Sequence, residues 1–203
     1  MVQSGAGKFF NTGIDLLDSD GMSFARGSDF HEINRILILS DKILVAAVNG
    51  PAAGYRMSSL ALYDLVYSVP DAYFFMPFVK WGMAAEGGSS VSFPRLMGHQ
   101  KAASLFLAAE RISALEAERL GVVSKILPKE GFFEQVMQIA GTIAQSAPGS
   151  LRATKEQMRQ PFGRTCSRPT TANVIRRTAT DMAPRSTKRL WGSSAPRSVR
   201  SRD

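Results

Sequence analysis

Residues 45–55 read VAAVNGPAAGY, an apolar run that ends in a turn rich in glycine and proline. This segment constrains the fold more than any other. The run 43–48 predicts a strand buried on both faces, and residues 55–62 predict a helix that begins where the turn ends. A strand that passes through a tight turn into a helix presents backbone N–H groups at the turn. Such amides can stabilise an oxygen atom that gains negative charge during a reaction.

A single carboxylate follows at Glu86, thirty-two residues after Gly54, within the small-residue run AAEGG at 84–88. A carboxylate among small residues can act as a general base. Amides that receive a developing oxyanion, together with one base, indicate removal of a proton next to a carbonyl group.

The composition is that of a globular protein. The chain has 203 residues, of which 44% are hydrophobic, and this length allows one domain with a sizeable core. No apolar run reaches the length of a membrane span, and the N-terminus lacks the pattern of a signal peptide. A single cysteine, Cys166, cannot form an internal disulfide. These features predict an intracellular protein.

The net charge of +8 is concentrated at the C-terminal end. Residues 161–203 contain ten Lys/Arg and two Asp/Glu, so residues 1–160 carry fifteen of each and are neutral. The same segment is rich in Ser, Thr, Arg and Pro and has weak apolar periodicity, which predicts a disordered basic tail. A nucleic-acid-binding tail is one alternative, although no aromatic residues alternate with the basic ones. We expect a domain over 1–160 and a tail over 161–203.

The remaining patterns predict a mixed α/β chain. Short strands are expected at 65–68, 73–76 and 122–127, and helices at 30–40, 89–97, 101–109, 132–144 and 150–160. Ser113 with Glu116 forms a capping box, so another helix should begin there.

Three ordered segments resemble the crotonase (enoyl-CoA hydratase/isomerase) superfamily: GAGKFFNTGID at 5–15, AAVNGPAAGY at 46–55, and RISA with the following LGVV and Pro128. The resemblance implies a spiral of ββα units that is incomplete at the N-terminus and helical toward the C-terminus. It also implies an oxyanion hole formed by the backbone N–H groups of Ile14 and Tyr55. After about Gln160 the composition of the chain departs from the family pattern. A shifted reading frame or a mispredicted splice in the gene would produce such a change.

The acidic residues indicate which branch of the superfamily the chain resembles. Hydratases of the family use two glutamates, and the corresponding positions here hold Ser58 and Phe78. Glu86 stands where peroxisomal-type 3-enoyl-CoA to 2-enoyl-CoA isomerases keep a single catalytic glutamate. The resemblance therefore implies an acyl-CoA double-bond isomerase, with hydratase-like or other thioester chemistry, or an inactive truncated chain, as alternatives.

The same resemblance implies the remaining features of the site. Phe74, Phe75, Phe78 and Trp81 are candidates for an acyl pocket, with packing in the core as the alternative. Arg56 is a candidate contact for a coenzyme A phosphate, with a solvated cation at the start of a helix as the alternative. The substrate is an acyl-CoA thioester, and no separate cofactor or metal is expected. Relatives suggest a peroxisomal location and a homotrimer or hexamer, although the chain ends in SRD, which is not a peroxisomal address.

Overall fold

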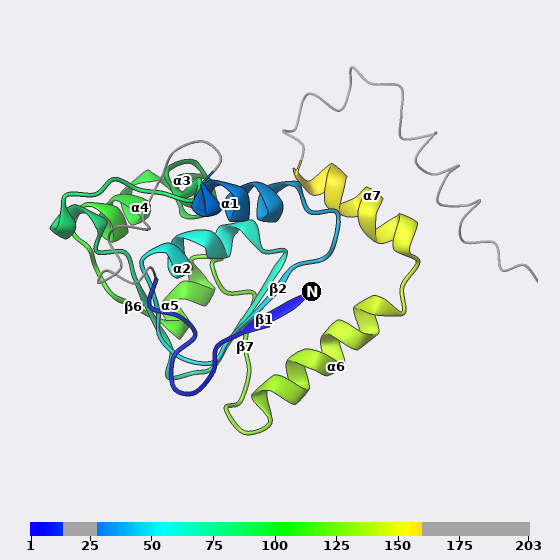
Figure 1. Ribbon diagram of the computed structural model, residues 1–203. Coiled ribbons are helices and arrows are strands. Elements are labelled where there is room, and N and C mark those ends of the chain that lie inside the picture. The colour runs from blue at the N-terminus through cyan, green and yellow to red at the C-terminus, as the bar shows by residue number, and fades with distance from the viewer. Residues whose placement is uncertain (14–27, 160–203) are drawn as a thin grey trace, which may run out of the picture. The chain divides into compact units, whose positions relative to one another are not determined.

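The computed structural model describes residues 1–13 and 28–159. The chain divides into two compact units, Met1–Ser146 and Ala147–Asp203. The first unit contains two small sheets and the helices that cover them (Figure 1). Ile14 and the predicted tail from 161 onward lie outside the described residues.

The larger sheet is parallel throughout and has the strand order β1-β2-β4-β7. Its strands are β1 (Val2–Ser4), β2 (Val45–Val48), β4 (Leu65–Ser68) and β7 (Lys125–Ile126). All four residues of β2 are buried between its two neighbours, as the apolar run predicts. The segment 122–127, predicted to be extended, contributes only the two residues of β7.

The second sheet has the order β3-β5-β6. Its strands are β3 (Ala52–Ala53), β5 (Tyr73–Phe75) and β6 (Ile112–Ser113), and β6 is antiparallel to β5. An isolated parallel bridge between Asn11 and Ala52 extends this sheet on the other side. Three times the chain enters the first sheet and then the second before it turns into a helical segment, at β1 and Asn11, at β2 and β3, and at β4 and β5. This is the expected ββα spiral of a mixed α/β fold.

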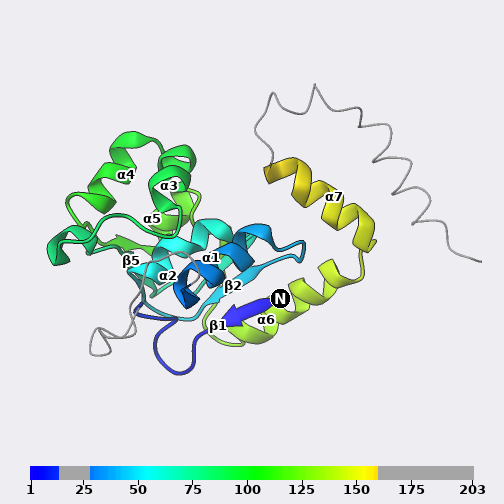
Figure 2. The same ribbon diagram turned by 45° about the horizontal axis from the view of Figure 1, so that its top comes forward.

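The helical segments complete these turns (Figure 2). They are α1 (Asp29–Leu39), α2 (Tyr55–Ser58), the 3-10 helices η2 (Ser59–Leu62) and η3 (Phe78–Trp81), α3 (Ser89–Met97) and α4 (His99–Phe106). The predicted helix at 55–62 divides into α2 and η2. Ser58 and Ser59 donate their hydroxyls to the carbonyls of Tyr55 and Arg56, three residues earlier. Such bonds compete with regular α-helical pairing.

The C-terminal part of the first unit follows the sequence pattern closely. Helix α5 (Ala114–Arg119) begins at the predicted cap, where the Ser113 hydroxyl accepts from the Glu116 amide at 3.2 Å. Helix α6 has the predicted bounds, Phe132–Ala144, and packs against β1 and β2. Its residues Phe132 and Val136 are buried.

Helix α7 (Pro148–Arg159) belongs to the second unit and is its only described segment. Proline at the first helical position fits because its missing N–H would have no partner there. Among the described helices, none is long and apolar enough to cross a membrane.

Candidate active site

At the turn after β3, the Tyr55 backbone amide has no hydrogen-bond acceptor among the described residues. Gly54 adopts φ 56° and ψ −127°, a conformation that only glycine adopts readily. Its N–H donates to the Phe75 carbonyl at 3.0 Å, and its own carbonyl accepts from Met57 and Ser58. The next amide, Tyr55 N–H, has no acceptor among the described residues. It is therefore available to a ligand oxygen.

The first predicted loop runs directly along this turn. The Phe10 and Asn11 amides donate to the Pro51 carbonyl at 3.1 and 3.4 Å, and the Ala53 amide donates back to the Asn11 carbonyl at 3.1 Å. A Cβ built on Gly13 would lie 3.7 Å from the Tyr55 nitrogen. The two segments thus meet immediately before Ile14. Ile14 itself is not among the described residues, and its donor role stays a prediction.

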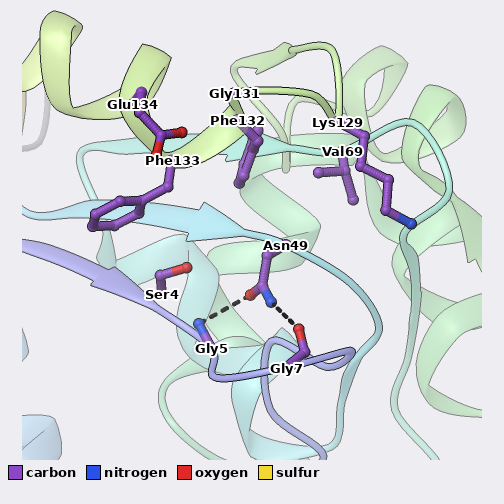
Figure 3. A pocket seen from close by; sticks show the side chains of 10 residues that line it. All are labelled: Ser4, Gly5, Gly7, Asn49, Val69, Lys129, Gly131, Phe132, Phe133 and Glu134. Atoms are coloured by element: carbon purple, nitrogen blue, oxygen red, sulfur yellow. Dashed lines mark hydrogen bonds between the residues drawn. The ribbon is translucent and has the colours of Figure 1, made fainter.

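Asn49 fastens the start of the first loop to the end of β2. Its Oδ1 accepts from the Gly5 amide at 2.9 Å, and its Nδ2 donates to the Gly7 carbonyl at 2.9 Å (Figure 3). Side-chain amides can replace backbone pairing in this way. Asn49 therefore holds the loop in place.

Replacing Asn49 by alanine should lower the free energy of unfolding by about 2 kcal/mol, because the Gly5 amide and the Gly7 carbonyl both lose their partners. Asn49→Asp is the matched control, since it can still accept from Gly5 but cannot donate to Gly7. Urea titrations should rank wild type above the aspartate variant and the aspartate variant above alanine. An alanine variant as stable as wild type would contradict the assignment.

Glu86 stands at the start of a tight turn made by two glycines. Gly87 and Gly88 have φ values of 62° and 73°, and the Ser89 amide donates to the Glu86 carbonyl at 3.0 Å. Two successive positive φ values with this hydrogen bond are typical of a type I′ turn. The pair Gly87-Gly88 is thus the local reason that Glu86 projects ahead of α3.

The carboxyl group of Glu86 is half-buried. Its Oε2 atom is buried and has no hydrogen-bond partner among the described residues. Burial raises the pKa of Glu86 from 4.5 to about 7. A buried acid without a donor favours the neutral form, so its carboxylate is a stronger base than an exposed one.

The turn that follows Glu86 packs against α2, which begins at Tyr55. A Cβ built on Gly87 would lie 3.4 Å from Tyr55 Cε2, 3.4 Å from Ser58 Oγ and 3.5 Å from Asn34 Oδ1. Sequence reasoning missed Asn34. It is one of several polar residues of α1, whose sequence is DFHEINRILIL, and no signal in the sequence distinguishes it from the others.

The two positions that hold acids in hydratases have no acid here. Ser58 is fully buried and donates its hydroxyl to the Tyr55 carbonyl at 3.0 Å. Phe78 is also buried, and its Cε1 would lie 3.9 Å from a Cβ built on Gly54. An aromatic ring therefore covers the turn where a hydratase would need its second carboxylate.

The predicted acyl-pocket aromatics do not form one cluster. Phe74 is fully buried in the core, whereas Phe75 stacks on Tyr73 with a centroid separation of 6.1 Å and lies 5.3 Å from the Arg111 guanidinium. Trp81 is 51% exposed. Neighbouring residues of a strand face opposite sides, so β5 separates Phe74 from Phe75. Of the four, Phe78 lies against the oxyanion turn.

Arg56 lies over its neighbour in the chain. Its guanidinium carbon is 5.4 Å from the centroid of the Tyr55 ring. The phosphate contact of Arg56 stays a prediction. Within residues 1–13 and 28–159, no group of three or more metal-ligating side chains occurs.

An open pocket of about 550 Å³ lies apart from Glu86, between the carboxyl ends of β1 and β2 and the start of α6 (Figure 3). Lys129 at its edge pairs with Asp71 at 2.5 Å. The pocket is lined by Ser4, Gly5, Gly7, Asn49, Val69, Lys129, Gly131, Phe132, Phe133 and Glu134. Asn49, which holds the first loop, also lines this pocket, whereas Tyr55 and Glu86 do not.

Known proteins share this architecture. The enoyl-CoA hydratase/isomerase family matches residues 1–183, a region that runs past Gln160. Enoyl-CoA delta isomerase 2 of Rattus norvegicus is 36% identical over 78% of this chain and 42% of the relative. Enoyl-CoA delta isomerase 3, peroxisomal, of Mus musculus is 31% identical over 78% of this chain and 52% of the relative. The chain thus spans about half the length of these relatives.

A solved structure of an enoyl-CoA hydratase/isomerase from Pseudoalteromonas atlantica T6c superposes with a TM-score of 0.74 and 26% identity. The superposition covers 89% of this chain and 68% of that one. The family match, the relatives and the ββα spiral agree. The chain belongs to the enoyl-CoA hydratase/isomerase family and has the crotonase fold.

Proposed function

We propose that this chain is an acyl-CoA double-bond isomerase that converts 3-enoyl-CoA to 2-enoyl-CoA thioesters. The observation that carries the proposal is the placement of one half-buried carboxylate, Glu86, whose Oε2 atom is buried, on a turn packed against Tyr55, whose amide has no acceptor among the described residues. Moving a double bond between neighbouring carbons needs one base and one site for the enolate oxygen.

The reaction follows from these groups. The Glu86 carboxylate takes a proton from C2 of the acyl chain, and the electron pair moves onto the thioester oxygen. The Tyr55 amide, together with the Ile14 amide, stabilises this oxygen, each by about 3 kcal/mol as in other oxyanion holes. The protonated Glu86 then returns the proton to C4, and the double bond moves from C3 to C2. The same carboxyl group serves as base and then as acid.

Hydration is the alternative chemistry within the family. A relative of Escherichia coli K12 at 29% identity is a 2,3-dehydroadipyl-CoA hydratase. Adding water needs a second acidic group to hold and activate it, and here Ser58 and the buried ring of Phe78 occupy those positions. This difference favours isomerisation. Two relatives that carry the isomerase name support the same choice.

The remaining parts of the proposal rest on the relatives. We infer that the substrate is an acyl-CoA thioester, that no separate cofactor is required, and that the assembly is a homotrimer or hexamer. A peroxisomal location is proposed because a mouse relative carries that word in its name. Purified chain incubated with a 3-enoyl-CoA should form the conjugated 2-enoyl product; hydrated product would support the alternative, and no product would support an inactive chain.

The rate should depend on pH through Glu86. Burial raises the pKa of this carboxyl to about 7, and only the ionised form can take the C2 proton. The value of kcat/KM should therefore rise as pH increases through about 7 and reach a plateau above it. Initial rates from about pH 5 to about pH 9 measure the midpoint. A rate that stays constant down to the ordinary range of glutamate would contradict the assignment.

A further inference from the structure

We propose that Asn11 is a positioning residue of the oxyanion site: its side-chain oxygen holds the backbone of Gly13 in place beside the Tyr55 amide. The proposal rests on the proposed function, in which that amide receives the enolate oxygen of the substrate. Asn11 takes no part in the proton transfer and acts through Gly13.

The backbone of Asn11 joins the first loop to the second. Its amide donates to the Pro51 carbonyl at 3.4 Å, and its carbonyl accepts from the Ala53 amide at 3.1 Å. These two bonds make the isolated parallel bridge between Asn11 and Ala52. Within residues 1–13 and 28–159, Gly13 takes part in no backbone–backbone hydrogen bond. The backbone pairing of the loops therefore holds Asn11 but does not reach Gly13.

The side chain of Asn11 continues the attachment. Its Oδ1 accepts from the Gly13 amide at 2.8 Å, and in the described part of the chain this is the one hydrogen bond of that amide. A side-chain oxygen that binds the amide two residues later forms an Asx turn. Gly13 has a φ of 103°, and glycine has more backbone freedom than any other residue. The Asn11 oxygen therefore selects one conformation of a residue that would otherwise adopt several.

Gly13 in turn lies against the amide that is available to a ligand. A Cβ built on Gly13 would be 3.4 Å from the Ala53 carbonyl oxygen and 3.7 Å from the Tyr55 nitrogen. The position of Gly13 thus limits the space in which an oxygen atom can approach the Tyr55 amide. Oxyanion stabilisation depends on donors and walls that are already in place, and a misplacement of about 1 Å can cost up to about a hundredfold in rate.

The test measures enolate stabilisation directly, in a Glu86→Gln background, so that neither turnover nor ionisation of Glu86 contributes. The probe is acetoacetyl-CoA, whose enolate absorbs in the near ultraviolet, and the absorbance gives the midpoint of its ionisation while bound. Asn11→Ala removes the acceptor of the Gly13 amide. Stabilisation of the enolate should fall about tenfold, so the midpoint should rise by about one pH unit.

Two further variants control for this change. Asn11→Ser differs from Asn11→Ala by one oxygen atom, which can accept from the same amide more weakly, so it should recover part of the shift. Thr12→Ala changes an exposed neighbour in the same loop and should leave the midpoint unchanged. Hydrogen exchange of the Gly13 amide needs no ligand; it should be fastest in Asn11→Ala and intermediate in Asn11→Ser.

An unchanged midpoint in Asn11→Ala, or a serine variant that behaves like the alanine variant, would overturn the proposal. If acetoacetyl-CoA ionised no more readily on the chain than in solution, the oxyanion site itself would be wrong, and both proposals would fail. The titration needs no turnover. A chain that shows the expected shifts but forms no isomerase product would therefore contradict the proposed function and not the role of Asn11.

Discussion

Glu86→Gln should reduce the isomerase rate by about a thousandfold, because the amide can neither take a proton from C2 nor return one to C4. The substitution keeps the size of the side chain and the Gly87-Gly88 turn, so binding of an acyl-CoA should change little. The measurement is the initial rate of conjugated product, with binding followed separately by titration calorimetry. Glu110→Gln, which changes an exposed glutamate, is the matched control and should keep the wild-type rate.

The same variant should be more stable than wild type at neutral and alkaline pH. The pKa of Glu86 is about 7 in the folded chain against 4.5 as its ordinary value. Between these values the folded state binds more protons than the unfolded state, so the stability that this group contributes below pH 4.5 is lost as pH rises through about 7. Glutamine does not ionise, so the Glu86→Gln variant does not lose this stability as pH rises. Urea unfolding at about pH 8 should show a gain, and at about pH 4 almost none.

Measuring both the rate and the stability of Glu86→Gln separates a catalytic role of Glu86 from a structural one. A variant that loses activity while gaining stability has lost a catalytic group. A Glu86→Gln variant that retains the wild-type rate would refute the assignment of the base. Simultaneous loss of rate and of stability would mean that Glu86 is structural.

Gly50→Ala should lower the free energy of unfolding by about 2–3 kcal/mol. A Cβ at this position would overlap the carbonyl oxygen of Lys8, which is backbone and cannot move without displacing the first loop. Because that loop leads to Gly13 and the Tyr55 amide, the isomerase rate should fall as well. Urea unfolding and initial rates measure the two effects.

Gly141→Ala provides the control for this change. Gly141 lies within α6, and a Cβ there would meet no heavy atom within 4 Å. Alanine is the better helix former, so this variant should gain about 0.5–1 kcal/mol. If Gly50→Ala proved as harmless as Gly141→Ala, the close approach of the first loop to β2 would be wrong.

Much of the fold could be predicted because its signals are local. The buried strand β2, the Gly54 turn and the bounds of α6 follow from runs of neighbouring residues. The Ser113 cap needed only the residue three positions later. The approach of the first loop to the second followed from the family resemblance, since no local pattern brings Gly13 to Tyr55.

Contacts between distant segments were harder to predict. The contacts of Asn34 depend on α1 passing Tyr55 and Gly87, which lie far from it in the sequence. The aromatic residues 74–81 were candidates for one acyl pocket because of the family resemblance. Because side chains alternate along β5 and η3 begins at Phe78, these aromatic residues lie in different environments.

The central claim is that the Tyr55 and Ile14 amides hold the thioester oxygen beneath the side chain at position 86. A crystal structure of the Glu86→Gln variant with a 3-enoyl-CoA bound tests it most directly. We expect the thioester oxygen within about 3 Å of both amide nitrogens, and the side chain at position 86 facing C2 and C4. A thioester bound in the pocket of Lys129 and Phe132, or a side chain at position 86 that points away from the acyl group, would contradict the account.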